Sequence, residues 1–422
     1  MVKVAVFGGG WAGCAAAVQS KKSGGDVILV ERTDMLLGTG LVGGIVRNNG
    51  RYTVFEELKE MGAKELVDLI DNNCLHKNID FPKHNHSSLY DVRTIEGEVR
   101  SLLNKLGIKL LFSNRGKEVV IKGEKIIKVI LDDGSEVEAD VFIDTTGSAG
   151  GIDNCTRYGN GCAMCILRCP TFGGRISISE KAGINEYQGI RENGEVGALS
   201  GACKIIKESL AKDIQIKLKE AGVCIIPIPK ELRKEKYLSI KVCQQYNYKE
   251  YEENLVLLDC GHAKLMAPYF PLELLRNVPG FEKARFSDPL SGGVTNSVRL
   301  LSSVHRNGYL QVEGVDNLFC AGEKAGLLIG HTEAIATGTL AGFNAVRVGK
   351  KEKMLAIPRQ LAIGEGIHFS GKILKSQGGN KNTFTFSGSI LFQHLKEQDL
   401  YTTDLDEIGK RVKKTGMKGI FS

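Results

Sequence analysis

The chain has 422 residues, of which 42% are hydrophobic and 25% are charged, and this balance excludes a disordered, collagen-like or coiled-coil protein. At roughly one domain per 150 residues, the length predicts about two or three structural units. The formal net charge of +7 is a mild excess of dispersed basic residues, which permits an anionic or nucleic-acid partner without requiring one.

The sequence carries no signal for a membrane. No apolar run approaches the roughly 18 residues that a membrane-spanning helix needs, so we expect no membrane partner. The stretch from Met1 to Phe7 leads directly into glycines, which predicts a buried strand rather than a signal peptide. Eleven cysteines, an odd number scattered along the chain, do not form the pattern of a secreted disulfide framework. We therefore expect a cytoplasmic protein.

The first 32 residues contain a dinucleotide-binding motif. The strand-like run Val2–Phe7 is followed by a glycine turn, an alanine-rich helical stretch and a second strand that ends in Glu31. Gly8 allows the tight turn, Gly10 lets the backbone approach a pyrophosphate, and Gly13 lets the helix pack closely on the strand. The carboxylate of Glu31 can accept hydrogen bonds from both ribose hydroxyls of an adenosine. The segment predicts the further cofactor-binding residues Trp11, Ala12, Arg32 and Gly38.

The next elements in the chain predict a helix, a strand and a small antiparallel meander. Helical spacing covers residues 89–104 and a strand follows at 107–112. Short strands are predicted at 117–121, 125–131 and 135–140, and a buried strand at 141–144 runs into Thr146 and Gly147. This order resembles the FAD domain of glutathione-reductase-type flavoproteins, which implies that Val119, Thr146 and Gly147 contact the cofactor.

A second resemblance to FAD enzymes lies far downstream. An apolar strand from Asp316 ends in Gly322-Glu323 and leads through Gly330, His331 and Thr332 into a long helix. In FAD enzymes the acid at this place bonds the ribityl chain, and the helix directs its N-terminus at the pyrimidine edge of the flavin, where its dipole stabilises the anionic reduced ring. The resemblance implies that FAD contacts Gly322, Glu323, Gly330, His331 and Thr332.

The downstream stretch is similar to two groups of flavoproteins. Gly314 to Glu323, Gly330 to Gly338 and Leu340 to Ala345 resemble the MnmG (GidA) and TrmFO families, which modify tRNA uridine with folate and FAD. Glu31 to Thr33 with Leu37 to Gly44 also resembles FAD-dependent oxidoreductases related to heterodisulfide reductase. The methyl-transferring tRNA family has a cysteine in the loop after the ribose acid, whereas residues 33–51 contain none. A second dinucleotide motif is also missing, so NAD(P)H would visit the flavin as an external donor.

A cluster of cysteines is the second candidate site. Cys155, Cys162, Cys165 and Cys169 fall within 15 residues, and the last three have the spacing Cys-x2-Cys-x3-Cys-Pro. This ending is similar to that of a bacterial ferredoxin motif, so a [4Fe–4S] cluster with these four ligands is one interpretation. A redox-active dithiol of Cys162 and Cys165, or a nucleophilic Cys169, is another. A zinc site and simple packing are further alternatives.

Together these observations predict an α/β protein with a Rossmann-type FAD-binding domain, three layers with a parallel sheet and a β-meander, interrupted by a mixed α/β substrate domain. We expect a discontinuous FAD domain at residues 1–150 and 291–350, an inserted substrate and redox domain at 151–290, and an α-rich segment at 351–422. Within the inserted domain, the sequence predicts a helix at 201–222 and a strand at 224–228. The leading hypothesis is an FAD-dependent oxidoreductase that passes reducing equivalents between flavin and the cysteine cluster or an adjacent substrate, with a small molecule or protein as redox partner.

Two alternatives stay open at the level of sequence. One is a folate- and FAD-dependent enzyme that modifies uridine in tRNA or rRNA, with RNA as the partner. The other is a flavin-binding protein without turnover of its own that binds RNA or transfers electrons. The sequence assigns neither the substrate nor the oligomeric state.

Overall fold

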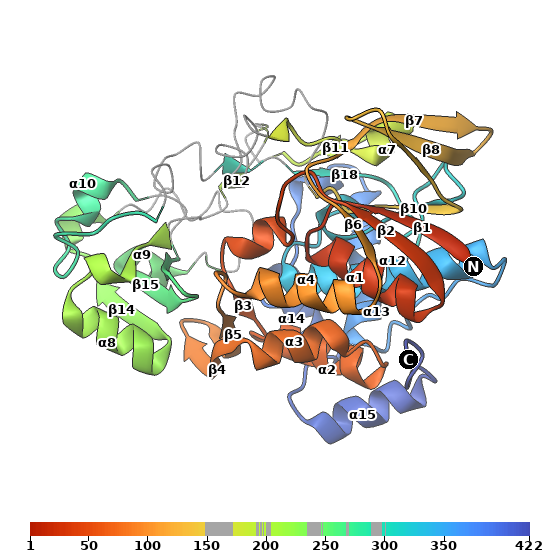
Figure 1. The fold of residues 1–422 in the computed structure, drawn as a ribbon. Coiled ribbons are helices and arrows are strands. Elements are labelled where there is room, and N and C mark those ends of the chain that lie inside the picture. Colours follow the sequence, from red (N-terminus) through yellow and green to blue (C-terminus); the bar gives the residue numbers. More distant parts are fainter. Residues whose placement is uncertain are drawn as a thin grey trace.

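The computed structural model describes residues 1–147, 172–190, 194, 196, 198–199, 204–233, 246, 248–266, 270–287, 298–299 and 301–422. The cysteine cluster from Cys155 to Cys169 lies outside these residues, so the structure does not bear on its predicted roles. Figure 1 shows a central sheet with helices packed around it and a smaller lobe, drawn in green, that projects to one side.

In the described part of the chain, the central sheet has five parallel strands in the order β19-β10-β1-β2-β6. Phe7 on β1 pairs with Val30 on β2 and Asp144 on β10, and Asp144 pairs with Cys320 on β19. The carboxyl ends of these four strands are therefore level and form one edge. The strands are β1 (Val2–Phe7), β2 (Gly25–Val30), β6 (Lys109–Leu111), β10 (Val141–Asp144) and β19 (Leu318–Cys320).

The sheet is covered on both faces, as its nearly continuous apolar strands require. Helices α1 (Trp11–Lys22) and α12 (His331–Gly349) pack against each other beneath it, and the meander β7 (Gly116–Lys122), β8 (Lys125–Leu131) and β9 (Glu136–Glu138) lies above it (Figure 1). A Cβ atom at Gly338 would overlap the carbonyl oxygen of Ala12, and one at Gly342 would overlap that of Ala16. Glycine at these two positions lets α12 lie directly against α1. The predicted Rossmann-type α/β fold is confirmed.

Two predicted helices differ from the observed elements. The helix expected over 89–104 begins only at Ile95, because Leu89 and Tyr90 end strand β5 and are fully buried by pairing with its neighbours. A helix expected over 201–222 is shorter as well and begins at Lys212. The observed helices are α4 (Ile95–Lys105) and α8 (Lys212–Ala221). Strand β5 (His84–Tyr90) pairs with β3 (Ile45–Val46) and β4 (Cys74–Phe81), and helices α2 (Gly50–Glu60) and α3 (Glu65–Asn72) lie between β3 and β4 in the chain.

A second group of buried side chains, from Ile205 to Ala284, forms its own apolar core in the green lobe of Figure 1. Its antiparallel sheet has the order β13-β16-β15-β14. The expected strand at Cys224 is present, and Cys224 and Cys260 are buried. The division of the chain into domains stays a prediction. The lobe comprises β13 (Lys204–Ile205), β14 (Val223–Pro227), β15 (Asn254–Asp259), β16 (Ala263–Leu265), α9 (Lys249–Glu253) and α10 (Leu272–Leu275).

Three helices follow α12 and pack on the main core, namely α13 (Ala362–Leu374), α14 (Ser389–Glu397) and α15 (Leu405–Lys414). The buried carboxylate of Glu57, on α2, accepts hydrogen bonds from the amides of Ala362 and Ile363 at the start of α13 (2.8 and 3.0 Å). Short strand pairs join β11 (Tyr187–Gln188) to β18 (Ser302–Ser303) and β12 (Ala198–Leu199) to β17 (Val298–Arg299), and α7 covers Ile178–Lys181. Within the described ranges, no helix combines the length and apolar character that crossing a membrane requires.

Candidate functional site

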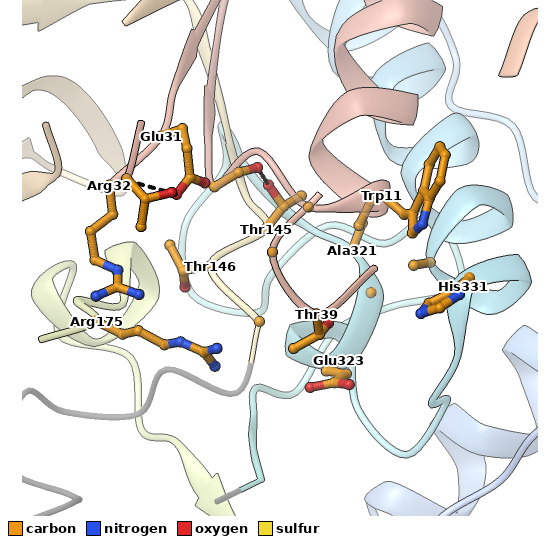
Figure 2. A pocket seen from close by; sticks show the side chains of 18 of the residues that line it. Trp11, Glu31, Arg32, Thr39, Thr145, Thr146, Arg175, Ala321, Glu323 and His331 are labelled. Carbon is orange, nitrogen blue, oxygen red and sulfur yellow. Dashed lines mark hydrogen bonds between the residues drawn. The ribbon is translucent and has the colours of Figure 1, made fainter. Parts of the chain in front are cut away.

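A large cavity opens at the carboxyl edge of the central sheet, where ligands of open α/β sheets bind. Its wall is built from the segments that follow β1, β2, β10 and β19, and Figure 2 shows side chains from these segments facing one space. The structure therefore brings together residues that are more than 300 positions apart in the chain. The predicted residues in the wall are Gly8, Gly10, Trp11, Ala12, Glu31, Arg32, Gly38, Thr146, Gly147, Gly322, Glu323, Gly330 and His331.

The turn between β1 and α1 has the shape needed to hold a phosphate group. Gly8 has a φ angle of +102°, and a Cβ atom there would lie 2.5 Å from the carbonyl oxygen of Thr145. A Cβ atom at Gly13 would overlap the carbonyl oxygen of Gly8, so this position holds the helix close to the strand. Among the described residues, no atom lies within 4 Å of where a Cβ atom at Gly10 would stand, and this position faces the cavity. Helix α1 begins after Gly10 without a side-chain cap, which leaves its first amides available to an anion.

Glu31 is held in place by the neighbouring backbone. Its Oε2 atom accepts a hydrogen bond from the amide of Gly9 (2.7 Å), and its Oε1 atom accepts two from Thr33, from the amide (2.8 Å) and the hydroxyl (2.9 Å). The carboxylate is buried and forms part of the cavity wall. A carboxylate oxygen can accept more than one hydrogen bond, so the same group can accept hydroxyls of a bound ribose.

Three arginines surround the same end of the cavity. Arg32 donates a hydrogen bond from Nη1 to the carbonyl oxygen of Gly173 (2.6 Å), and Arg115 donates one to that of Gly174. Arg175, from the segment that these two bonds hold, also lines the cavity (Figure 2). Of these three arginines, the sequence predicts only Arg32 as a cofactor-binding residue.

The segment between β19 and α12 forms the other end of the cavity. Figure 2 shows Glu323 and His331 on the side away from Glu31 and Arg32. Glu323 is half-buried in a 3-10 turn at Gly322–Ala325, and His331 is the first residue of α12. Helix α12 begins after Gly330, again without a side-chain cap. The start of a second helix therefore lies at this wall.

A buried ion pair fixes the start of α12. Arg51 donates hydrogen bonds from Nε to both carboxylate oxygens of Glu333 (3.0 and 3.1 Å) and from Nη2 to the carbonyl oxygen of Ile329 (3.3 Å). The amide of Phe386 donates to the same carboxylate (2.8 Å). Glu333 is fully buried and Arg51 forms part of the cavity wall, so helix α12 is tied to α2 and to the C-terminal region at the site.

Three predicted residues, Gly13, Val119 and Thr332, are not part of the cavity wall. Val119 pairs with Val129 within the meander and is not in the wall, whereas Gly116 at the start of the same strand is. Thr332 is fully buried, and its hydroxyl has no hydrogen-bond partner in the described part of the chain. Gly13 lies behind the wall, where its lack of a side chain leaves room for the carbonyl oxygen of Gly8.

Sequence reasoning missed several residues of the wall because no local motif marks them. Arg51 lies on α2, Lys264 lies on β16 of the smaller lobe, and Tyr246 packs against His84 of β5. Thr145 and Ala321 directly follow β10 and β19, and their positions could have been found from the strand ends alone. The additional wall residues include Thr39, Arg51, Asn114, Arg115, Gly116, Thr145, Tyr246, Lys264 and Ala321.

The described cysteines are packing residues rather than reactive thiols. Burial raises the pKa of Cys74, Cys260 and Cys320 to about 12, so these thiols stay protonated at neutral pH. Cys14 is fully buried and donates a hydrogen bond from Sγ to the carbonyl oxygen of Gly9 (3.4 Å). Among the described residues, no group of three or more histidine, cysteine or acidic side chains could hold a metal ion.

The wall fits an elongated dinucleotide. It offers a fixed carboxylate at one end, a glycine turn and a helix N-terminus in the middle, and a second acidic side chain with a second helix N-terminus at the other end. These groups match a ribose, a pyrophosphate and a polyhydroxyl chain joined to an electron-rich ring. The open space above Gly10, which any side chain would fill, is the observation most specific to this ligand class.

The chain matches a family model and several curated relatives. The family model of glucose inhibited division protein A matches residues 3–267 and 264–353. Methylenetetrahydrofolate–tRNA-(uracil-5-)-methyltransferase TrmFO from Streptococcus pyogenes serotype M6 is 33% identical over 106 residues, which is 23% of this chain and 21% of that protein. The same enzyme from Enterococcus faecalis is 31% identical over 118 residues, or 26% of each chain. The match thus spans about a quarter of these curated relatives.

Solved structures show the same fold at low sequence identity. GidA from Aquifex aeolicus, in its form II crystal, superposes with a TM-score of 0.72 at 15% identity, over 100% of this chain and 74% of that chain. The form I crystal of the same protein gives a TM-score of 0.64 at 14% identity, over 100% and 76%. The described part of the chain therefore has the fold of these GidA structures.

Proposed function

The chain belongs to the family of glucose inhibited division protein A (GidA), and from this premise we propose that it is an FAD-dependent enzyme that modifies uridine in tRNA. The resemblance to the MnmG (GidA) and TrmFO flavoproteins is confirmed by the family match over residues 3–353. That match, which includes both halves of the cavity wall, is the observation that carries the proposal. It favours RNA modification over electron transfer to a cysteine cluster, which led the sequence hypotheses.

In this proposal the cavity holds FAD along the carboxyl edge of the sheet. Glu31 accepts the ribose hydroxyls, and the first amides of α1 face the pyrophosphate. Glu323 accepts from the ribityl chain, and the start of α12 supports negative charge on the ring. When bound, FAD supplies hydride and electron transfer, and NAD(P)H is the external donor we propose. The chain's own residues bind and orient the ring and close its edge from water.

The type of uridine modification depends on the nucleophile, and the described residues of the cavity wall include no cysteine. Residues 33–51 lack the cysteine of the methyl-transferring family, and the described cysteines have raised pKa values. We therefore propose modification of uridine without assigning the transferred group. Cys155, Cys162, Cys165 and Cys169 stay candidates for a thiolate, a dithiol or cluster ligands.

The direct test combines cofactor analysis with RNA chemistry. The purified chain is incubated with unmodified tRNA transcripts, FAD, NADH and methylenetetrahydrofolate, and the nucleosides are then analysed by mass spectrometry. We expect bound FAD and a new 5-substituted uridine. A Glu31→Ala variant, which has lost the ribose acceptor, should lose both. A chain that binds FAD but neither retains nor modifies tRNA would contradict the RNA part of the proposal.

Two further measurements separate the alternatives. Binding to labelled tRNA should weaken steeply as salt rises, because phosphate contacts release counterions. A Cys165→Ser variant with FAD still bound tests the cysteine cluster. Loss of about four irons per chain would indicate a [4Fe–4S] cluster, whereas loss of uridine modification in a chain without iron would indicate a thiol. Full activity of serine variants at all four cysteines would show that they only pack.

A further inference from the structure

Four segments of the chain meet at one buried hydroxyl beside the cavity. Tyr90 is fully buried at the end of β5. Its hydroxyl contacts Trp11 at the start of α1, Gly40 in the loop after β2, and His331 at the start of α12. Trp11 and His331 line the cavity, whereas Tyr90 lies behind them. The ring of Trp11 meets that of Tyr90 edge-on, with centroids 5.8 Å apart and an angle of 74°.

The directions of these hydrogen bonds follow from the donors available. The indole nitrogen of Trp11 can only donate, so it donates to the Tyr90 hydroxyl (3.1 Å). A phenol has one proton, and Tyr90 donates it to the carbonyl oxygen of Gly40 at 2.6 Å, which can only accept. Burial raises the pKa of Tyr90, so the phenol keeps this proton at neutral pH.

The third contact then has one remaining direction. His331 Nδ1 lies 3.1 Å from the Tyr90 hydroxyl, whose proton is already directed at Gly40. The bond therefore forms only if Nδ1 carries a hydrogen and donates it. In a neutral imidazole one nitrogen donates and the other accepts.

We propose that Tyr90 is a positioning residue that holds the proton of neutral His331 on Nδ1, and that Nε2 of His331 is therefore a hydrogen-bond acceptor at the α12 end of the cavity. This inference deepens the proposed function, and it depends on FAD only for the identity of the partner. An acceptor here suits an N–H of a bound heterocycle, such as the pyrimidine part of a flavin. The same atom is the one that takes up a proton when the imidazole becomes charged.

The test is histidine NMR on the whole chain with ¹⁵N-labelled histidine, with the His331 signals assigned by their loss in His331→Gln. At a pH where the ring is neutral, we expect Nδ1 to resonate as a protonated nitrogen and Nε2 as an unprotonated one. In Tyr90→Phe the tautomer ratio should change by about tenfold toward Nε2–H, which corresponds to the loss of one hydrogen bond. The wild-type measurement alone decides the proton position if this variant does not fold.

Tyr251→Phe is the matched control. The Tyr251 hydroxyl is also buried and donates to a backbone carbonyl, that of Pro82 at 2.7 Å, but Tyr251 lies on α9, so its replacement should leave the His331 tautomer unchanged. The inference is overturned if wild-type His331 carries its proton on Nε2, if both nitrogens stay protonated over the accessible pH range, or if Tyr90→Phe leaves the ratio unchanged.

The same spectra distinguish failure of this inference from failure of the proposed function. If FAD occupies the cavity, its addition should move the Nε2 signal of His331 more than the Nδ1 signal. A chain that binds no FAD would refute the cofactor proposal while the tautomer of the free protein still tests the role of Tyr90. A chain that binds FAD with the wrong tautomer would refute the role of Tyr90 alone.

Discussion

Replacing Glu31 with glutamine should weaken FAD binding in two ways. It weakens the contact of residue 31 with the ribose, and it weakens the hydrogen bonds that hold the neighbouring turn at Gly9. Both carboxylate oxygens accept amide hydrogens, one from Gly9 and one from Thr33 (2.7 and 2.8 Å). In glutamine one oxygen becomes an NH2 group, so a donor must face one of these donors whichever way the amide is turned. The remaining oxygen cannot serve the backbone and both ribose hydroxyls.

The size of this effect follows from the loss of one charge-assisted hydrogen bond in a buried site. Such bonds contribute about 1.5–3 kcal/mol, which corresponds to an increase in Kd of about 10- to 150-fold. The free energy of unfolding of the cofactor-free protein should also fall, because the Gly9 turn loses an acceptor in the absence of ligand. Binding must therefore be measured at a temperature at which both proteins are folded.

Trp11 makes this measurement direct. It is the only tryptophan of the chain, and it lines the cavity, so quenching of its fluorescence reports FAD binding without a label. Glu136→Gln is the matched control, because Glu136 is exposed and pairs with Lys128 far from the wall. A Glu31→Gln protein that is folded and binds FAD within threefold of wild type would refute the role of Glu31.

Further predictions concern residues around the same wall. Glu323→Ala should lower FAD retention after exhaustive dialysis, since the loss of one charged acceptor costs about 1.5–3 kcal/mol of binding; unchanged occupancy would exclude this role. Arg51→Met should lower the free energy of unfolding in urea by about 3–5 kcal/mol, because Glu333 is left buried without its cation. The double variant Arg51→Met/Glu333→Gln should lose less, and equal losses would contradict the buried ion pair. Burial raises the pKa of Glu57 to about 7, although the hydrogen bonds from the two amides of α13 favour the charged form and lower the pKa. Because the pKa of Glu57 is higher in the folded protein, the free energy of unfolding should fall by about 3 kcal/mol as pH rises from 4.5 to 7. Urea unfolding at pH 5 and pH 8 should show this decrease in the wild type and not in Glu57→Gln. Parallel pH profiles of the two proteins would show that Glu57 is charged throughout.

The sequence was sufficient for the part of the site that a local pattern encodes. The turn from Gly8 to Gly13 and the acid at the end of β2 depend on neighbours within about 30 residues, so their spacing carries the whole geometry. Arg51 and Tyr90 act through partners about 240 to 280 positions away, at Glu333 and His331. The hydrophobic periodicity of a single segment carries no information about such long-range contacts. The apolar spacing near Tyr90 predicts a helix, whereas Tyr90 is buried because its strand pairs with neighbouring strands.

Transfer of a residue from a resemblance depends on the register of the strand. Val119 was predicted from its place in the meander, but the pairing of β7 with β8 shifts between Gly116 and Glu118. Gly116 lines the cavity, whereas Val119 lies three residues further along β7 and pairs with Val129. At Gly116 a side chain would collide with Ile178. The lack of a side chain at Gly116 therefore lets β7 pack closely against Ile178 and Val129.

The packing of α1 on α12 explains how two distant halves of the chain form one wall. Each helix begins at the cavity after an uncapped glycine, Gly10 or Gly330. The contacts of Gly338 and Gly342 with the α1 backbone fix the distance between these two N-termini. A cofactor that is anionic at its centre and becomes anionic at its ring needs this fixed pair of helix ends. Lys264 of the smaller lobe also lines the wall, so the cavity is formed by the helix pair together with a residue from that lobe.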